Sequence, residues 1–247
     1  MRRLTVMVSL LVLLSMACAW SVQTLAPTPE IPTQSQPEIQ TETPRPATGQ
    51  VFNGPDINYK GIRFTLDPAL GSRLYVFEDV ITLEGATAHN IRFSVTPEEY
   101  CQTWCLMVYP VAEFEQAFGK FVFPPDGYRG GAAVIFDAQK MGLSFQNGSG
   151  GRSLETFGQS HYGVSNESLK YVFRGYSTDK QYGIYVQVPI RAISLPDVAP
   201  TIEFNSQEVL DYNKKAAESM NSLTTTDFTP NLDLLDALVK SIDVKTP

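Results

Sequence analysis

The stretch LKYVFRGYSTDKQYGIYVQVPI, residues 169–190, decides the fold class. Its two arms, residues 169–176 and 181–190, are rich in aromatic and β-branched side chains, which favour β-strands. Between the arms, residues 177–180 form a short polar run that is typical of a turn. Two such arms around four polar residues predict an antiparallel β-hairpin.

A second hairpin is predicted immediately upstream. Residues 139–146 alternate between apolar and polar positions, with Met141, Leu143 and Phe145 on one face. The chain then enters NGSGG at residues 147–151 and continues through a further β-rich run at 152–157. Asn-Gly sequences supply the positive φ angles that a tight turn between strands requires.

The region before these hairpins predicts more strands. Residues 59–66 place Ile62, Phe64 and Leu66 on one face, and Asp67-Pro68 ends the run. Further predicted elements are strands at residues 73–81, 90–95 and 105–109 and a helix at residues 110–118.

Two helices are predicted to close the chain. Asn205 followed by Glu208 is typical of a capping box at a helix N-terminus. Thr229-Pro230 provides a cap and a first position for the second helix, with Asp233 and Asp236 near the positive end of its dipole. The apolar stripes are Val209, Tyr212, Ala216, Met220 and Leu223 in the first helix and Leu232, Leu235, Leu238, Val239 and Ile242 in the second.

Strands grouped together and helices grouped at the end predict an α+β fold with a mainly antiparallel β-sheet packed by helices. The 197 residues from 51 to 247 fall within the range of one domain and can bury a sizeable core. They contain no internal repeat and no second linker. We therefore expect a single globular domain over residues 51–247.

Residues 1–17 predict a signal peptide. Met1-Arg2-Arg3 is a short positive region, and the 14 residues from Leu4 to Ala17 are uncharged and mostly apolar. This run is too short to span the hydrocarbon core of a membrane, which needs roughly 20 residues, and it suits the apolar region of a secretory signal.

Cys18 follows a small residue at the end of this signal and resembles the lipobox of bacterial lipoproteins. In that family the cysteine becomes the lipidated first residue of the mature chain, so we expect Cys18 to carry the anchor. Ser15 and Met16 depart from the usual lipobox residues. The alternative is an ordinary secretory signal that is cut near Ala17, with Cys18 incidental.

Residues 18–50 are predicted to be the lipidated cysteine and a disordered tether. The 28 residues from 23 to 50 include six Pro, six Thr and five Gln, and no aromatic residue. Such a composition cannot bury enough apolar surface to offset the entropy of ordering. The predicted location is the cell envelope, lipid-anchored on the extracytoplasmic face of the membrane.

Cys101 and Cys105 are predicted to form a disulfide. In an oxidising compartment, two cysteines separated by three residues most simply pair with each other in a small loop. The alternative is a redox-active pair, but redox motifs place two residues between the cysteines and lie in a βαβ unit, which is not predicted here.

No catalytic, cofactor or metal site is predicted. A zinc site formed by Cys101, Cys105 and the only two histidines, His89 and His161, lacks metal-ligand spacing. Ser149 lies in a Gly-rich stretch without the Gly-x-Ser-x-Gly elbow of serine hydrolases. The same stretch has no Gly-Lys-[Ser/Thr] and so does not predict a phosphate-binding loop.

Other candidate residues have structural interpretations. The carboxylates Glu98-Glu99, Glu113 with Glu115, and Asp233 with Asp236 are interpreted as solvated charges or helix-start charges. Core packing accounts for most of the aromatic side chains near the 169–190 hairpin, and an exposed tyrosine face that binds glycans or a protein is the alternative. These aromatic residues are Tyr162, Tyr171, Phe173, Tyr176, Tyr182 and Tyr185.

The charge balance excludes one class of partner. The chain has 19 basic and 26 acidic residues and a formal net charge of −7. The attraction to phosphates that supplies most non-specific affinity for nucleic acids is therefore missing. We expect no nucleic-acid partner.

Several stretches carry a family resemblance: LSFQNGSG at 143–150, YVFRG at 171–175 and FTPNLDLLDALVKS at 228–241. The chain resembles an uncharacterised family of secreted lipoproteins from Chloroflexi-type bacteria, and this resemblance implies no catalytic residues. More distantly, GIRF at 61–64, the late hairpin and the closing helix are similar to PsbP-like domains. That resemblance implies an α/β/α sandwich around an antiparallel sheet, in a group with several lipid-anchored, non-enzymatic members.

Three functional hypotheses follow. The first is a lipid-anchored extracytoplasmic protein whose domain binds a protein, glycan or other ligand or supports an envelope assembly, without catalysis. The second is an envelope hydrolase or redox enzyme, which requires His89 or His161 in a cleft beside a Ser, a Cys or a carboxylate. The third is a small solute-binding lipoprotein, which requires a roomy apolar pocket.

Overall fold

The computed structural model describes residues 50–83, 86–97, 104–119 and 132–245. The signal peptide at 1–17, the lipidation site Cys18, and the tether up to residue 49 lie outside the described residues. Cys101 and Glu98-Glu99 also lie outside them. The predictions for these segments therefore stay predictions.

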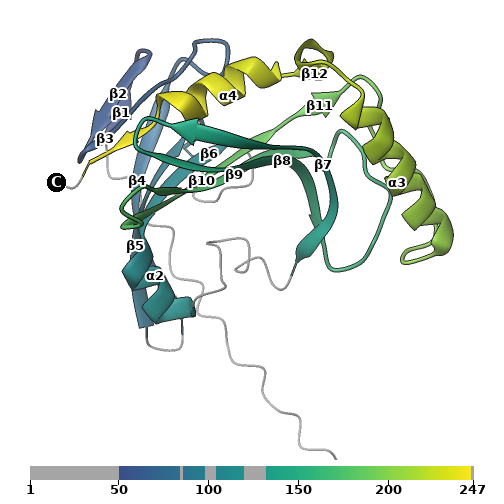
Figure 1. The fold of residues 1–247 in the computed structure, drawn as a ribbon, viewed down its shortest axis with the longest axis horizontal. Coiled ribbons are helices and arrows are strands. Elements are labelled where there is room, and N and C mark those ends of the chain that lie inside the picture. Colours follow the sequence, from purple (N-terminus) through teal and green to yellow (C-terminus); the bar gives the residue numbers. More distant parts are fainter. Residues whose placement is uncertain (1–49, 84–85, 98–103, 120–131, 246–247) are drawn as a thin grey trace, which may run out of the picture. The chain divides into compact units, whose positions relative to one another are not determined.

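An eight-stranded antiparallel sheet forms the centre of the domain (Figure 1). Each neighbouring pair in this sheet is antiparallel. In spatial order the strands are β1 (Val51–Phe52), β4 (Leu74–Leu83), β5 (Ala86–Ser94), β6 (Cys105–Pro110), β10 (Tyr182–Pro189), β9 (Lys170–Ser177), β8 (Gly148–Gly158) and β7 (Ala133–Phe145).

In the described part of the chain, three helices and two small sheets accompany the large sheet. The helices are α2 (Val111–Phe118), α3 (Gln207–Asn221) and α4 (Leu232–Ser241), with a 3-10 turn η2 (Thr225–Asp227) before α4. The small sheets are β2 (Asp56–Tyr59), β3 (Ile62–Thr65) and β13 (Asp243–Val244) in one, and β11 (Arg191–Ala192) with β12 (Phe228–Thr229) in the other. The predicted α+β class with a mainly antiparallel sheet is confirmed.

Both predicted hairpins are present. Strands β9 and β10 pair from Gly183 opposite Tyr176 to Pro189 opposite Lys170. Strands β7 and β8 meet at a turn that pairs Phe145 with Gly148. In β8 a glycine is required, because a Cβ atom on Gly150 would lie 2.0 Å from the carbonyl oxygen of Arg174 on β9.

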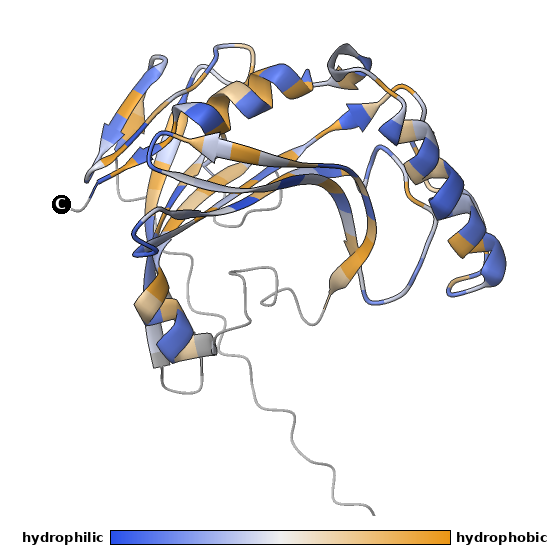
Figure 2. Cartoon of the chain, in the orientation of Figure 1, coloured by the Kyte–Doolittle hydropathy of each residue, from blue (hydrophilic) through white to orange (hydrophobic). Residues whose placement is uncertain are grey.

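One face of the sheet packs against α4 and the small β2–β3–β13 sheet, and these elements carry orange apolar segments in Figure 2. The core combines buried residues of α4, such as Leu235 and Val239, with Phe93 and Phe173 of the large sheet. Phe64 of β3 meets Phe93 edge-to-face, with ring centroids 5.1 Å apart. The small sheet is therefore part of the main core.

The structure corrects the interpretation of Asp236 as a solvated charge at a helix start. It is only 5% exposed, and it accepts a hydrogen bond of 2.9 Å from the hydroxyl of Tyr171. The guanidinium of Arg152 lies 3.4 Å from the same carboxylate. This buried network ties α4 to β8 and β9, whereas Asp233 remains exposed in the first turn.

The structure also corrects three predicted boundaries. The strand predicted over residues 59–66 is interrupted by a turn, where Lys60 has φ 44° and Gly61 has φ 79°. Helix α3 is capped by Ser206, whose Oγ accepts from the N–H of Val209, because Asn205 has left-handed backbone geometry and its Oδ1 accepts from His161 instead. Helix α4 is capped by Asn231 rather than Thr229, which lies in β12.

Within the described part of the chain, no helix combines the length and apolar character needed to cross a membrane.

Candidate functional site

A pocket opens where two strands of the large sheet separate. Strands β4 and β5 pair continuously from Tyr75 opposite Ser94 to Leu83 opposite Ala86. The next pair, β5 with β6, spans only three residues of each strand, and β6 then passes into α2. Among the residues that the structure describes, the first half of β5 therefore has a strand neighbour on one side only.

Helix α2 satisfies part of this unpaired edge. The carboxylate of Glu113 accepts a hydrogen bond of 3.0 Å from the backbone N–H of His89. A side chain thus replaces the carbonyl that a neighbouring strand would have supplied. The space beside this edge is bordered by the β2–β3 hairpin and by β13.

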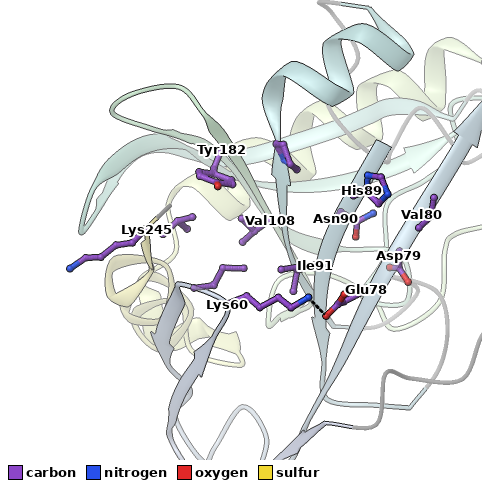
Figure 3. A pocket seen from close by; sticks show the side chains of 13 residues that line it. Lys60, Glu78, Asp79, Val80, His89, Asn90, Ile91, Val108, Tyr182 and Lys245 are labelled. Atoms are coloured by element: carbon purple, nitrogen blue, oxygen red, sulfur yellow. Dashed lines mark ion pairs between the residues drawn. The ribbon is translucent and has the colours of Figure 1, made fainter. Parts of the chain in front are cut away.

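The pocket has a volume of about 400 Å³ and combines an apolar floor with charged groups around it (Figure 3). Its lining residues come from six strands, from the β2–β3 turn and from Lys245, directly after β13. They are Lys60, Ile62, Glu78, Asp79, Val80, His89, Asn90, Ile91, Val108, Pro110, Tyr182, Val244 and Lys245.

Strand register explains which side chains share the pocket face. Glu78 is paired with Ile91, and Ile91 is paired with Val108. Residues directly opposite each other in antiparallel strands project to the same face. The carboxylate of Glu78 therefore stands at the edge of an apolar surface that includes Ile91 and Val108, with Ile62 buried beside them.

Alternation directs the next residues to the reverse face. Asp79 is paired with Asn90, one position along from Glu78 and Ile91. Asp79 forms an ion pair of 2.8 Å with Arg92, which is 2% exposed and lies over the ring of Phe77. Asn90 is 3% exposed, and its side-chain nitrogen and oxygen find no hydrogen-bond partner among the described residues.

Two neighbouring groups hold the Glu78 carboxylate. The hydroxyl of Tyr59 donates to Oε1, and the ammonium of Lys60 lies 2.6 Å from the same oxygen. Hydrogen bonds from Lys60 and then from Tyr59 lower the pKa of Glu78 below its ordinary value, although partial burial opposes them. Glu78 is therefore ionised at neutral pH.

His89 lies beside a carboxylate at the pocket edge. Its Nδ1 is 3.0 Å from Glu113, and the two side chains are 63% and 43% exposed. Burial on its own would raise the pKa of Glu113, but hydrogen bonds from the His89 ring and backbone lower it overall. The lining residues that the structure describes include no Ser, Thr or Cys, so among them the pocket has no aliphatic hydroxyl or thiol nucleophile.

The other predicted site residues do not converge on this pocket. His161 is half-buried, and its backbone N–H donates to Asn205 at 2.8 Å. Cys105 is fully buried and disulfide-bonded, and the other two cysteines of the chain lie outside the described residues. No three metal-ligating side chains cluster in the described ranges. Ser149 is an exposed strand residue opposite Tyr176.

Core packing accounts for most of the aromatic residues near the 169–190 hairpin, as predicted, because Tyr182 also packs against the main core. Tyr171, Phe173 and Tyr185 are fully buried. Tyr176 is 39% exposed, and Tyr182 is half-buried in the pocket wall.

Sequence reasoning missed the residues at the pocket mouth. Glu78 lies in the middle of a predicted strand, where a single carboxylate carries no distinctive signal. The Lys60-Gly61 pair could have been recognised as a turn, since glycine favours the positive φ that a tight turn requires. Recognising this turn would have predicted a hairpin in place of the single strand over residues 59–66.

Comparison with protein-family models, curated proteins and solved structures returns no match for this chain.

Proposed function

We propose that residues 51–247 form a non-catalytic ligand-binding domain of a lipid-anchored protein on the extracytoplasmic face of the membrane. The pocket of about 400 Å³ carries this proposal. Pockets for small molecules occupy about 300–1,000 Å³ and combine apolar walls with a few well-placed polar groups. Here the walls include Ile62, Ile91 and Val108, and Glu78 is the polar group at their edge.

A hydrolase is the second candidate, and the His89–Glu113 pair favours it. That pair is largely exposed, and Glu113 does not line the pocket. A general base must lie within hydrogen-bond reach of the group it activates, together with groups that stabilise the transition state. The lining residues that the structure describes include no Ser, Thr or Cys for the pair to activate, and Glu113 itself lies outside the lining, so we prefer binding.

The predicted anchor and tether agree with this proposal. A domain that captures a ligand near the membrane needs an attachment point and a spacer, and Cys18 and residues 18–50 would supply them. The anchor also explains the odd number of cysteines, because one would carry lipid while Cys101 and Cys105 pair.

We further propose that the fold is a PsbP-like α/β/α sandwich. Helix α4 packs on the face that includes Phe173 and Val186. Phe114 of α2 packs instead with Ala88 and Tyr109, whose side chains project to the opposite face by strand alternation. Helices on both faces of an antiparallel sheet support this arrangement.

Dye binding tests the pocket directly. The secreted full chain with Cys18→Ser, which carries no lipid, would be titrated with the neutral apolar dye Nile red. Ile91→Trp fills the pocket wall and should weaken dye binding at least tenfold. Leu210→Trp, at a 40% exposed position on α3, is the matched control and should leave binding unchanged. Equal binding by both variants would contradict the proposal.

A further inference from the structure

The charged group at the pocket mouth is anchored in the sheet. Glu78 lies within β4, which pairs with β5 along nine residues. The hydroxyl of Tyr59 and the ammonium of Lys60 both contact Oε1. No hydrogen bond from the described residues reaches the second carboxylate oxygen, Oε2. The carboxylate is therefore held in place and retains an open acceptor.

Its partner Lys60 is free to move. The side chain is 53% exposed and extends from the tip of the β2–β3 hairpin on a flexible four-carbon stem. An exposed ion pair of this kind contributes little to stability, because water screens the attraction and holding the side chain costs entropy. The ammonium can leave the pocket mouth, whereas the backbone of Glu78 is fixed in β4 and the Tyr59 hydroxyl still contacts its carboxylate.

The neighbouring charges leave Glu78 as the group that selects the ligand. Asp79 is held by Arg92 at 2.8 Å. The ammonium of Lys245 lies 3.8 Å from Asp243 and points away from Glu78 in Figure 3. A ligand cation could bind Oε2 or replace the Lys60 ammonium, whereas a ligand anion would face an ionised carboxylate that cannot be displaced.

We propose that the pocket binds an amphipathic organic cation, in which a protonated amine pairs with Glu78 and an apolar body covers Ile62, Ile91 and Val108. The ring of Tyr182 in the pocket wall extends the surface that is available to the apolar body. The net charge of −7 favours the approach of a cation over that of an anion. This inference rests on the proposed binding function and names the ligand class of the same pocket.

Two probes of equal chain length test the sign of the ligand charge. The secreted Cys18→Ser chain would be titrated by calorimetry at pH 7 with n-octylammonium and with n-octanoate. We expect the ammonium to bind at least tenfold more tightly. Glu78→Gln should weaken it at least tenfold, whereas Lys60→Met, which removes the internal competitor, should leave it unchanged or tighten it severalfold.

Matched variants separate charge from folding. Asp137→Asn removes another half-exposed carboxylate that pairs with a lysine, Lys140, and Asp137 does not line the pocket, so this variant should not change ammonium binding. Glu78→Asp keeps the charge but shortens its reach, and should bind more weakly than the wild type and more tightly than Glu78→Gln. This ranking keeps the test informative even if Glu78→Gln folds poorly.

Octanoate binding as tight as that of the ammonium, or ammonium binding that is unaffected by Glu78→Gln, would overturn the inference. If Nile red still bound in a way that Ile91→Trp weakens, the inference on ligand class would fail while the binding function stood. Failure of the dye, the ammonium and the carboxylate alike would overturn both.

Discussion

Two carboxylates lie near opposite ends of the large sheet, Asp236 on helix α4 and Glu78 on strand β4, and each is contacted by one tyrosine hydroxyl and one cation. Asp236 meets Tyr171 and Arg152 where α4 packs on the sheet, and both charged side chains are less than a tenth exposed. At the pocket, Glu78 meets Tyr59 and Lys60, and these charged side chains are 36% and 53% exposed. The same chemistry thus stabilises the fold at one end and remains available to a ligand at the other.

The largest effect should come from breaking the buried network. Asp236→Ala leaves Arg152 buried without its countercharge and Tyr171 without its acceptor, so the free energy of unfolding should fall by about 3–5 kcal/mol. Chemical denaturation measures this loss. Asp233→Ala, in the exposed first turn of the same helix, is the control and should cost less than about 1 kcal/mol. Equal losses in the two variants would contradict the buried role of Asp236.

The buried network could not have been predicted from the sequence. Asp236 is 65 residues from Tyr171 and 84 residues from Arg152 along the chain. A helical pattern places Asp236 near a dipole, but only the docking of α4 on β8 and β9 shows that it is buried. The hairpins were predictable because Asn147-Gly148 and the aromatic arms at 169–176 and 181–190 act over a few neighbouring residues.

The pocket escaped prediction for a different reason. The pocket exists because β5 extends beyond its pairing with β6 and because the chain turns at Lys60-Gly61. Both features depend on where a strand ends. Alternation predicts the strands themselves well, but their ends depend on which neighbours are present. Glu78 contacts Tyr59 and Lys60 only when the β2–β3 hairpin folds back beside β4.

A buried amide on the reverse side of the pocket end should give the next largest effect. The side-chain amide of Asn90 has no hydrogen-bond partner in the described part of the chain, so Asn90→Leu should raise the free energy of unfolding by about 1–3 kcal/mol. The matched control is Asn213→Leu. Asn213 accepts from Val164 and donates to Tyr162, each at 2.9 Å, so its loss should destabilise the domain by a similar amount. Destabilisation by Asn90→Leu would show that the amide is satisfied in solution.

Removing the exposed carboxylate of Glu78 should change the stability of the domain much less. Glu78→Gln should change the free energy of unfolding by no more than about 1 kcal/mol, because the Lys60 pair is screened by water. In the same denaturation experiment, Asp236→Ala should therefore lower the free energy of unfolding several times more than Glu78→Gln does. A loss as large as that of Asp236→Ala would mean that the mouth of the pocket is a structural clamp and not an accessible site.

The smallest expected effect is the pH dependence of the difference in unfolding free energy between the wild type and Glu78→Gln. The pKa of Glu78 is lowered in the folded state, chiefly by the hydrogen bond from Lys60, so its contribution to stability is present above the pKa of the unfolded chain, near 4.5. That contribution is lost as the pH falls through the lower folded pKa, when both states bind the proton. The difference in unfolding free energy between the wild type and Glu78→Gln should therefore be greatest near neutral pH and should shrink in acid. A difference that grows below pH 4.5 would mean that the protonated carboxyl is the stabilising form, and it would remove the basis for pairing this group with a ligand cation.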